Sequence, residues 1–330
     1  MRRRVFVLIC LLPAVFLPPV LTEAQQPKKV PRIGFVSGVG DSNNPGPGIE
    51  AFRQGLRDRG YIEGKNIAVE YRYLEGHVDR AKGFIAELVQ LKVDVLVSPN
   101  FPAIRAAKEA TKTTPVVMVI TVDPVSNGLV ESLAHPGGNI TGIARLTRDL
   151  SGKRLELFKE LVPGISRVGV LWDTNAPGPV LALKEYETAA RALKIPLQSL
   201  EIRGPNPDLD GAFQAASKGR ANAIIAILNP VVARYTKRIA DLAIKNRLPS
   251  MFERSEDVEA GALASYSAND AEIFGRVAIY VDKILKGAKP ADLPVEQPMK
   301  FEFVINLKTA KQIGLTIPQS VLYRADKVIK

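Results

Sequence analysis

The sequence predicts an α/β fold of two Rossmann-like lobes, in which parallel sheets are flanked by helices. Apolar runs of strand length recur along the chain and alternate with segments of helical spacing, the order that builds parallel sheets. These runs lack the polar alternation of a half-exposed strand, which favours sheets covered on both faces. A chain of 330 residues exceeds the usual size of a single hydrophobic core, so two lobes are expected.

The amino terminus has the layout of a cleaved secretory signal peptide. Three arginines at positions 2–4 precede an apolar run over residues 5–21, and a small-residue stretch ends at Ala24. A membrane anchor is the alternative, but prolines interrupt the run, and it is short for a helix that must cross about 30 Å of hydrocarbon. We therefore expect residues 1–24 to be a signal peptide and the mature protein to be periplasmic.

The only cysteine, Cys10, lies inside that apolar run, so the mature chain would carry no thiol. A lipid-modified cysteine is the alternative, but Leu8 and Ile9 are bulkier than a lipoprotein signal normally carries. Disulfides and thiolate metal sites are thereby excluded.

Loss of residues 1–24 lowers the formal charge from +11 to +9. The basic residues are dispersed without a block of five or six, which argues against nucleic-acid binding.

The first lobe is expected from strand runs over residues 33–36, 93–97 and 116–120, with helices over residues 49–56 and 81–88. The second lobe follows from strand runs over residues 168–172, 224–228 and 250–252. Residues 32–36 (RIGFV) and 167–171 (RVGVL) are a weak internal echo, each beginning its own sheet, and residues 146–164 form a linker followed by a helix.

The chain is then expected to recross between the lobes. Residues 261–266 form a short strand, residues 273–284 an amphipathic helix closed by Gly287, and a proline-rich stretch over 290–298 is extended. The lobes join near Ala144 to Thr147, and the pattern gives three hinge crossovers in all. Lobe 1 is predicted to comprise residues 30–145 plus 268–297. Lobe 2 is predicted to comprise residues 146–267 plus 298–330.

Four stretches carry a resemblance to a known family. They are residues 53–66 (RQGLRDRGYIEGKN), 123–142 (DPVSNGLVESLAHPGGNITG), 152–173 and 301–318 (FEFVINLKTAKQIGLTIP). In this order they resemble the tryptophan/tyrosine-type family of ABC transporter substrate-binding proteins.

The resemblance implies a type I periplasmic-binding fold without enzyme activity or cofactor. It also implies a monomer that closes on a small ligand and delivers it to an ABC permease in the inner membrane. An amino acid or an aromatic compound is the ligand class that some relatives suggest. Two other functions stay open: an extracytoplasmic sensor subunit for a membrane signalling partner, and an exported hydrolase using Asp123 or Glu253.

Ligands of open parallel sheets bind beyond the carboxyl ends of the strands. Short hydroxyl and amide side chains suit such a place, and neighbouring glycines let backbone N–H groups approach an anion. The candidates from the first lobe are Ser37, Gly38, Ser98, Asn100, Thr121 and Asp123. Those from the second lobe are Asp173, Asn175, Asn229, Glu253 and Arg254, with Thr147 and Tyr266 in the hinge strands.

Each candidate also has a structural interpretation. The serines and asparagines could cap helices, and Asp123 could cap a helix over residues 125–133 instead of pairing with a ligand ammonium. Tyr266 could stack on a ligand, whereas Trp172 is expected in the core. His77 and His135 have no second ligand at metal spacing and are expected in solvated loops.

Several enzyme and regulator classes are excluded by missing motifs. The glycines at 38 and 40 would need a third at position 43 to bind a dinucleotide, and that position is Asn43. Neither a nucleophile elbow nor a phosphate loop is present, and only two histidines could serve as bases. A transcription regulator of this architecture would need a helix-turn-helix module where the signal peptide stands.

Overall fold

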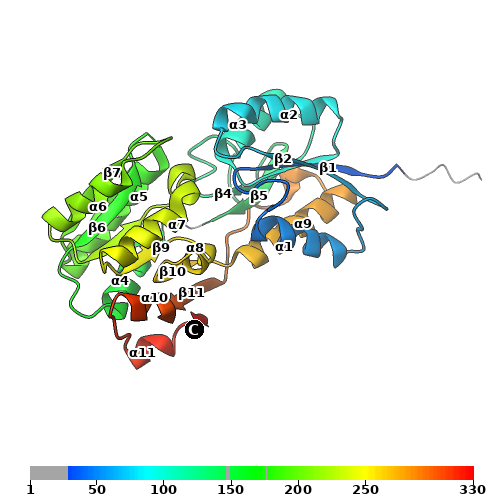
Figure 1. Cartoon of the computed structure of the whole chain (residues 1–330). Coiled ribbons are helices and arrows are strands. Elements are labelled where there is room, and N and C mark those ends of the chain that lie inside the picture. Colours follow the sequence, from blue (N-terminus) through cyan, green and yellow to red (C-terminus); the bar gives the residue numbers. More distant parts are fainter. Residues whose placement is uncertain (1–28, 146–148, 176) are drawn as a thin grey trace, which may run out of the picture.

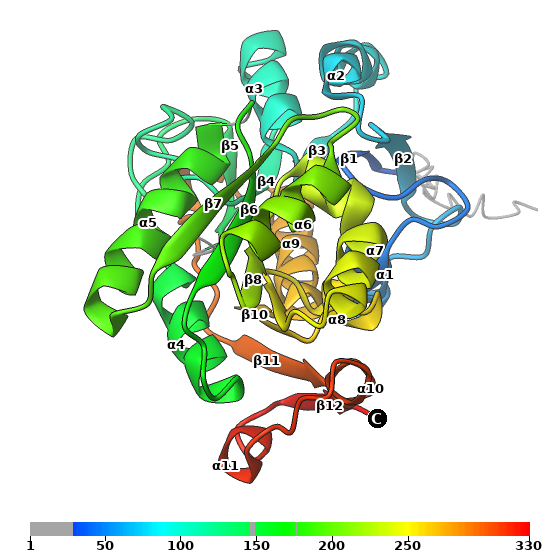
Figure 2. The same cartoon turned by 60° about the vertical axis from the view of Figure 1, so that its left-hand side comes forward.

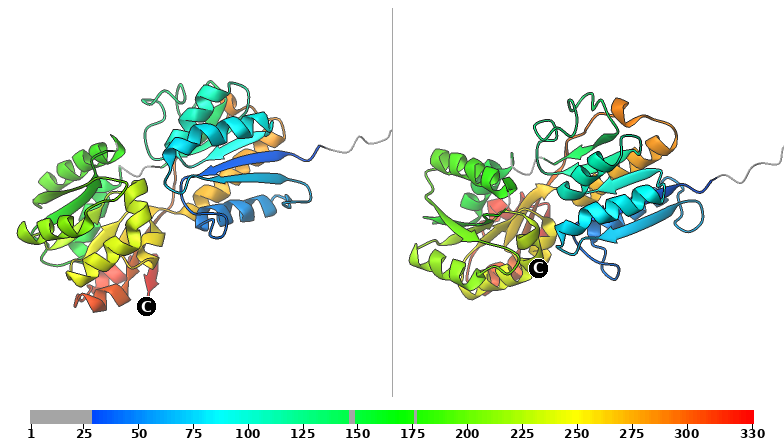
Figure 3. Two further views of the ribbon diagram at one scale, coloured as in Figure 1. Left: turned by 45° about the horizontal axis from the view of Figure 1, so that its top comes forward. Right: turned by 90° about the horizontal axis from the view of Figure 1, so that it is seen from above.

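The chain forms two lobes, each built on one sheet with helices on both faces (Figure 1). The structure is a computed structural model and describes residues 29–145, 149–175 and 177–330. The predicted signal peptide, Cys10 and Thr147 lie outside these residues. Figures 2 and 3 show the lobes from other directions, with the connecting segments between them.

The first lobe contains a five-stranded parallel sheet in the order β2-β1-β3-β4-β5. Its strands are β1 (Arg32–Ser37), β2 (Ala68–Tyr73), β3 (Val95–Ser98), β4 (Val116–Ile120) and β5 (Ile140–Ala144). Side chains of alternate strand residues enter two separate apolar clusters, because successive residues of a strand point to opposite faces. Helices α1 (Pro47–Arg57) and α9 (Asp270–Leu285) cover one face, and α2 (Ala81–Gln90) and α3 (Phe101–Ala110) cover the other.

The second lobe contains a seven-stranded sheet in the order β12-β11-β10-β9-β8-β6-β7. Its strands are β6 (Val168–Asp173), β7 (Leu197–Ile202), β8 (Ala223–Ala226), β9 (Ser250–Phe252), β10 (Ala264–Ala268), β11 (Phe301–Asn306) and β12 (Lys327–Ile329). One face is covered by α4 (Ser151–Leu161), α5 (Pro177–Leu193), α10 (Leu307–Gln312) and α11 (Gln319–Leu322). The other is covered by α6 (Leu209–Lys218) and α7 (Pro230–Lys245), and α8 (Ser255–Glu259) follows β9.

One strand departs from the predicted parallel arrangement. β11 pairs antiparallel with β10, whereas the other neighbours in this sheet are parallel. After β10 the chain enters the first lobe as α9 and then returns through the 3-10 turn η2 (Pro290–Asp292) to β11. It re-enters the second lobe from the hinge side, so β11 runs back along β10.

The chain therefore passes between the lobes three times, and the passages are held to one another. The Ala144 N–H donates to the Glu296 carbonyl at 2.9 Å, and the Glu296 N–H donates to the Gly142 carbonyl at the same distance. The carboxylate of Asp270, at the start of α9, lies 2.5 Å from the Arg145 guanidinium, just after β5. Backbone and side-chain contacts thus fix the connecting segments side by side.

The helix predicted over residues 125–133 is absent, and this expectation was wrong. The segment forms consecutive turns, in which the Leu129 N–H donates to the Pro124 carbonyl at 2.8 Å. Gly128 adopts a φ of 64°, which ends any helical run, and Val125, Ser126 and Asn127 have low helix propensity. Asp123 therefore supports a turn and does not cap a helix.

Candidate functional site

The carboxyl ends of β1 and β3 carry hydroxyl and amide side chains that order their own loops. The Ser37 hydroxyl donates to the Val39 carbonyl at 2.6 Å. The Ser98 hydroxyl donates to the Val36 carbonyl at 2.9 Å, and Asn100 caps α3 by accepting from the Ala103 N–H at 3.1 Å. Both serines are buried. Ser37, Ser98 and Asn100, which were predicted as site residues, therefore lie at adjacent strand ends. They also serve as a helix cap and as turn contacts.

Gly38 lies directly against Asn100. A Cβ atom at Gly38 would lie 2.8 Å from Asn100 Nδ2, so a side chain at this position would displace the Asn100 amide. The glycine thus allows the β1 loop to lie against the side chain that caps α3.

Thr121 and Asp123 line a hollow of about 400 Å³ next to the hinge, which we call the hinge pocket. Both residues are exposed. Asp123 Oδ1 accepts from the Val125 N–H at 2.8 Å and from the Ser126 N–H at 3.4 Å, so the carboxylate is oriented by the turn beneath it. The remaining lining residues are Val122, Pro124, Val125, Leu133, Ala144, Arg145, Asp149 and Gln297.

Two predicted residues of the second lobe are engaged in local caps. Asn229 caps α7 by accepting from the N–H groups of Val231 and Val232 at 2.8 and 3.0 Å. The buried carboxylate of Asp173 accepts from the Asn175 N–H at 3.0 Å. Both residues stand at strand ends as expected, and the contacts above give each a structural role.

Glu253 does not offer a carboxylate to a ligand, contrary to expectation. Its side chain is 2% exposed and lies 3.0 Å from the guanidinium of Arg154, which is 1% exposed. The same carboxylate accepts from the Tyr186 hydroxyl at 3.3 Å and from the Leu228 N–H at 3.0 Å. Both carboxylate oxygens thus accept hydrogen bonds inside the lobe. Glu253 is therefore not placed to act as the base of a hydrolase.

Arg154 was not singled out from the sequence, because it lies in a helix with charged residues on both sides. Its Nε donates to the carbonyl of Tyr266 in the hinge strand β10 at 2.7 Å. Burial alone would lower the pKa of Arg154, but Glu253, Tyr186 and Tyr266 together outweigh it and the pKa is raised. Burial raises the pKa of Tyr186 beside them. Arg154 therefore stays charged and Tyr186 stays neutral at neutral pH.

Tyr266 packs inside the second lobe. Its ring stacks on Phe301 with centroids 5.9 Å apart and meets Phe303 edge-on at 6.5 Å. The ring remains half-buried.

Trp172 is likewise half-buried, and its indole N–H donates to the Ser199 hydroxyl at 2.7 Å. His77 and His135 are exposed, as expected.

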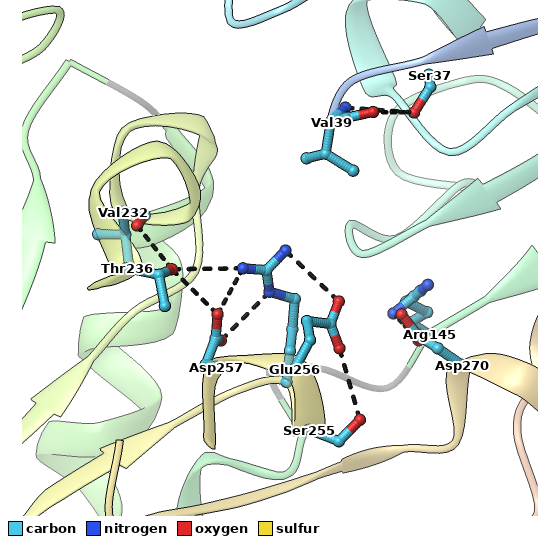
Figure 4. Close-up of polar contacts among 10 residues, drawn as sticks. Ser37, Val39, Arg145, Val232, Thr236, Ser255, Glu256, Asp257 and Asp270 are labelled. Atoms are coloured by element: carbon cyan, nitrogen blue, oxygen red, sulfur yellow. Dashed lines mark hydrogen bonds and ion pairs between the residues drawn. The ribbon is translucent and has the colours of Figure 1, made fainter. Parts of the chain in front are cut away.

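A charged cluster stands where β9 ends and α8 begins. Arg254 donates through Nη2 and Nε to the two carboxylate oxygens of Asp257 at 2.5 and 3.2 Å, and Nη2 lies 3.5 Å from the Thr236 hydroxyl. Arg254 Nη1 lies 3.6 Å from Glu256. Figure 4 shows Thr236, Glu256 and Asp257 on the side of the second lobe that faces the first, with Ser37 and Val39 above them.

Burial and charge perturb this cluster. Burial raises the pKa of Glu256, and the neighbouring charge of Asp270 adds to the effect, while Arg254 opposes it. Burial would lower the pKa of Arg254, but Asp257 and Glu256 raise it overall. Perturbed titratable groups that gather in one place mark candidate functional sites. One sequence signal points to the cluster, the run Arg254 to Asp257 (RSED) after a buried strand.

The described residues contain no group of three side chains suited to a metal ion. In the same part of the chain, every helix is too short or too polar to cross a bilayer.

Comparisons with known proteins place these features in context. A family model described as ABC transporter substrate binding protein matches residues 46–329. A tyrosine-binding protein of Clostridioides difficile (strain R20291) is 26% identical over 276 residues, which cover 81% of this chain and 76% of that protein.

Solved structures match over most of the chain. A conserved domain protein from Vibrio cholerae superposes with a TM-score of 0.81 at 30% identity, covering 91% of this chain and all of that one. An ABC domain in complex with L-Trp from Streptococcus pneumonia superposes with a TM-score of 0.80 at 25% identity, covering 91% of this chain and 99% of that one.

Proposed function

The chain belongs to the ABC transporter substrate-binding protein family, and from this premise we propose that it captures an aromatic amino acid between its lobes for import. As a member of this family it is a solute-binding protein and not an enzyme. The ligand class rests on its relatives, one named as tyrosine-binding and one solved with L-Trp. An ABC permease in the inner membrane is the partner we propose, and the periplasm is the compartment.

The observation that carries this proposal is that polar strand ends from both lobes face one space. Figure 4 shows Ser37 of the first lobe above the charged cluster of the second lobe, which includes Glu256 and Asp257. We propose that Gly38, Ser98 and Asn100, at the neighbouring strand ends, belong to the same face of the first lobe. Ligands of α/β sheets bind at such carboxyl ends. Polar groups from two lobes can hold the ends of an amino acid only when the lobes approach each other.

The hinge pocket suits the side chain of such a ligand. Its volume of about 400 Å³ falls in the range of roughly 300–1,000 Å³ typical of small-molecule sites. Pro124, Val125 and Leu133 give it apolar walls, while Thr121 and Asp123 give it a polar rim. We propose that the aromatic group enters this pocket and that Thr121 and Asp123 contact the ligand.

The mechanism needs no covalent chemistry. The lobes rock about the three connecting segments, and a ligand that contacts both lobes stabilises the closed state, which the permease binds. We propose residues 30–145 plus 268–297 and residues 146–267 plus 298–330 as the two moving bodies. Thr147, Asp173, Asn229 and Tyr266 complete the proposed site, with Asp173 and Asn229 ordering the loops that line it.

A thermal-shift screen of the purified protein tests the proposal. The panel contains the twenty amino acids, sugars, nucleosides and polyamines. A ligand at a hundred times its Kd adds about 2.7 kcal/mol of stability, which raises the melting temperature visibly. We expect L-tryptophan or L-tyrosine to give the largest rise, with calorimetry showing binding and no turnover. A rise with sugars or nucleosides alone would contradict the proposed ligand class.

A further inference from the structure

The partners of Arg254 hold its guanidinium unequally. Asp257 binds two of the three guanidinium nitrogens at 2.5 and 3.2 Å, the fork geometry that fixes an arginine most firmly. The third nitrogen, Nη1, has Glu256 at 3.6 Å, which is beyond the range of a hydrogen bond. Asp257 therefore anchors Arg254, whereas its contact with Glu256 is loose.

Exposure follows the same order. The Asp257 side chain is 2% exposed, that of Arg254 is 14% exposed, and that of Glu256 is 27% exposed. The anchoring carboxylate is thus buried in the lobe, while the loosely paired groups reach the surface that faces the first lobe. Arg254 and Glu256 are therefore more accessible to a solute than Asp257 is.

Charge balance leaves room for a cation. Arg254 and Arg145 supply two positive charges, whereas Glu256, Asp257 and Asp270 supply three negative ones. Burial raises the pKa of Glu256, the Arg254 charge opposes this shift, and the Asp270 charge adds to it. An ammonium group next to Glu256 would balance the excess negative charge.

We infer that Arg254 and Glu256 recognise the zwitterionic head group of the ligand, with the carboxylate on Arg254 Nη1 and the ammonium on Glu256. This rests on the proposed function and names the chemistry by which the same site selects its solute. The head group replaces the loose Arg254–Glu256 contact with two short charge-assisted hydrogen bonds. Asp257 and Thr236 meanwhile hold Arg254 in place.

The arrangement predicts selection against molecules that carry only half of the head group. A carboxylic acid without an amine would separate Arg254 from Glu256 and leave the glutamate without a positive partner in a partly dry cleft. An amine without a carboxylate would leave Arg254 Nη1 unpaired in the same way. Each loss costs affinity, because buried charged groups without partners are unfavourable. Uncharged sugars supply neither group.

Calorimetric titration with three matched probes tests the inference: L-tryptophan, tryptamine, which lacks the carboxylate, and indole-3-propionate, which lacks the amine. We expect the wild type to bind L-tryptophan at least roughly tenfold more tightly than either analogue. Glu256→Gln should weaken L-tryptophan roughly 10- to 100-fold, the scale of one charge-assisted hydrogen bond, and should not weaken indole-3-propionate, because the variant has no glutamate charge to leave without a partner. Arg254→Lys should weaken both carboxylate-bearing probes and spare tryptamine.

Glu259→Gln is the matched control. Glu259 is on the same helix, is 56% exposed and pairs with Lys327 at 2.7 Å, so its replacement should leave all three affinities unchanged. Melting curves of each variant confirm folding, and the wild-type analogue series gives an answer even if a variant does not fold. Equal L-tryptophan affinities for Glu256→Gln and Glu259→Gln would overturn this inference alone. If the wild type binds none of the amino acids, both this inference and the proposed function are overturned.

Discussion

Glu253→Gln is expected to destabilise the protein by about 3–5 kcal/mol, the usual cost of removing one partner from a buried ion pair. The side chains of Glu253 and Arg154 are 2% and 1% exposed, so water cannot hydrate the Arg154 charge once its partner is lost. The carboxylate now accepts from Arg154, Tyr186 and the Leu228 N–H. Glutamine keeps one acceptor oxygen, and its new NH₂ group would face donors.

Equilibrium urea unfolding measures this loss as a lower midpoint at unchanged slope. Glu259→Gln makes the same chemical change in an exposed pair and should alter the free energy of unfolding by no more than about 0.5 kcal/mol. Adding Arg154→Met to Glu253→Gln removes both charges and should cost less than the sum of the two single changes. If Glu253→Gln lowers the free energy of unfolding by less than about 1 kcal/mol, the assignment of a buried, fully hydrogen-bonded ion pair is refuted.

Further predictions concern Asp123, Glu256 and Gly142. Asp123→Ala should lower the free energy of unfolding by about 1 kcal/mol through loss of the turn contact, and Asp123→Asn should not. Because we propose that Asp123 contacts the ligand in the hinge pocket, Asp123→Ala should also weaken L-tryptophan in calorimetry, and unchanged affinity would leave Asp123 a turn residue. Because the raised pKa of Glu256 means that the folded state holds its proton more tightly than the unfolded chain does, its contribution to stability falls as pH rises above about 4.5. The melting temperature of Glu256→Gln relative to wild type should therefore increase from pH 4 to pH 8, and a constant difference would contradict the shift. Gly142→Ala should destabilise by at least about 3 kcal/mol in urea, because φ is 138° and the new Cβ would lie 2.1 Å from the Met118 carbonyl oxygen; Gly164→Ala, with positive φ but open space, should cost only about 1 kcal/mol.

The sequence by itself determined the fold class, and it predicted a site at the carboxyl ends of the strands. Central strands such as β3 and β4 are buried on both faces, so they must be continuously apolar, and that pattern is visible in the chain. The two-lobed α/β fold predicted from it is confirmed. The positions of the strand ends also follow from the pattern, and Ser98 and Asn100, two of the candidates predicted there, are in contact, since the Asn100 N–H donates to the Ser98 hydroxyl at 3.1 Å.

Only the tertiary structure decided which strands form the edges and which charges meet. β2 and β7 stand at sheet edges and mix apolar with polar residues, so a search for apolar runs missed them. The partner of Glu253 is Arg154, 99 positions away on another element, and its burial cannot be read from neighbouring residues. Local periodicity reports how a segment is covered, whereas pairing between distant charges depends on how whole elements pack, which is decided in three dimensions.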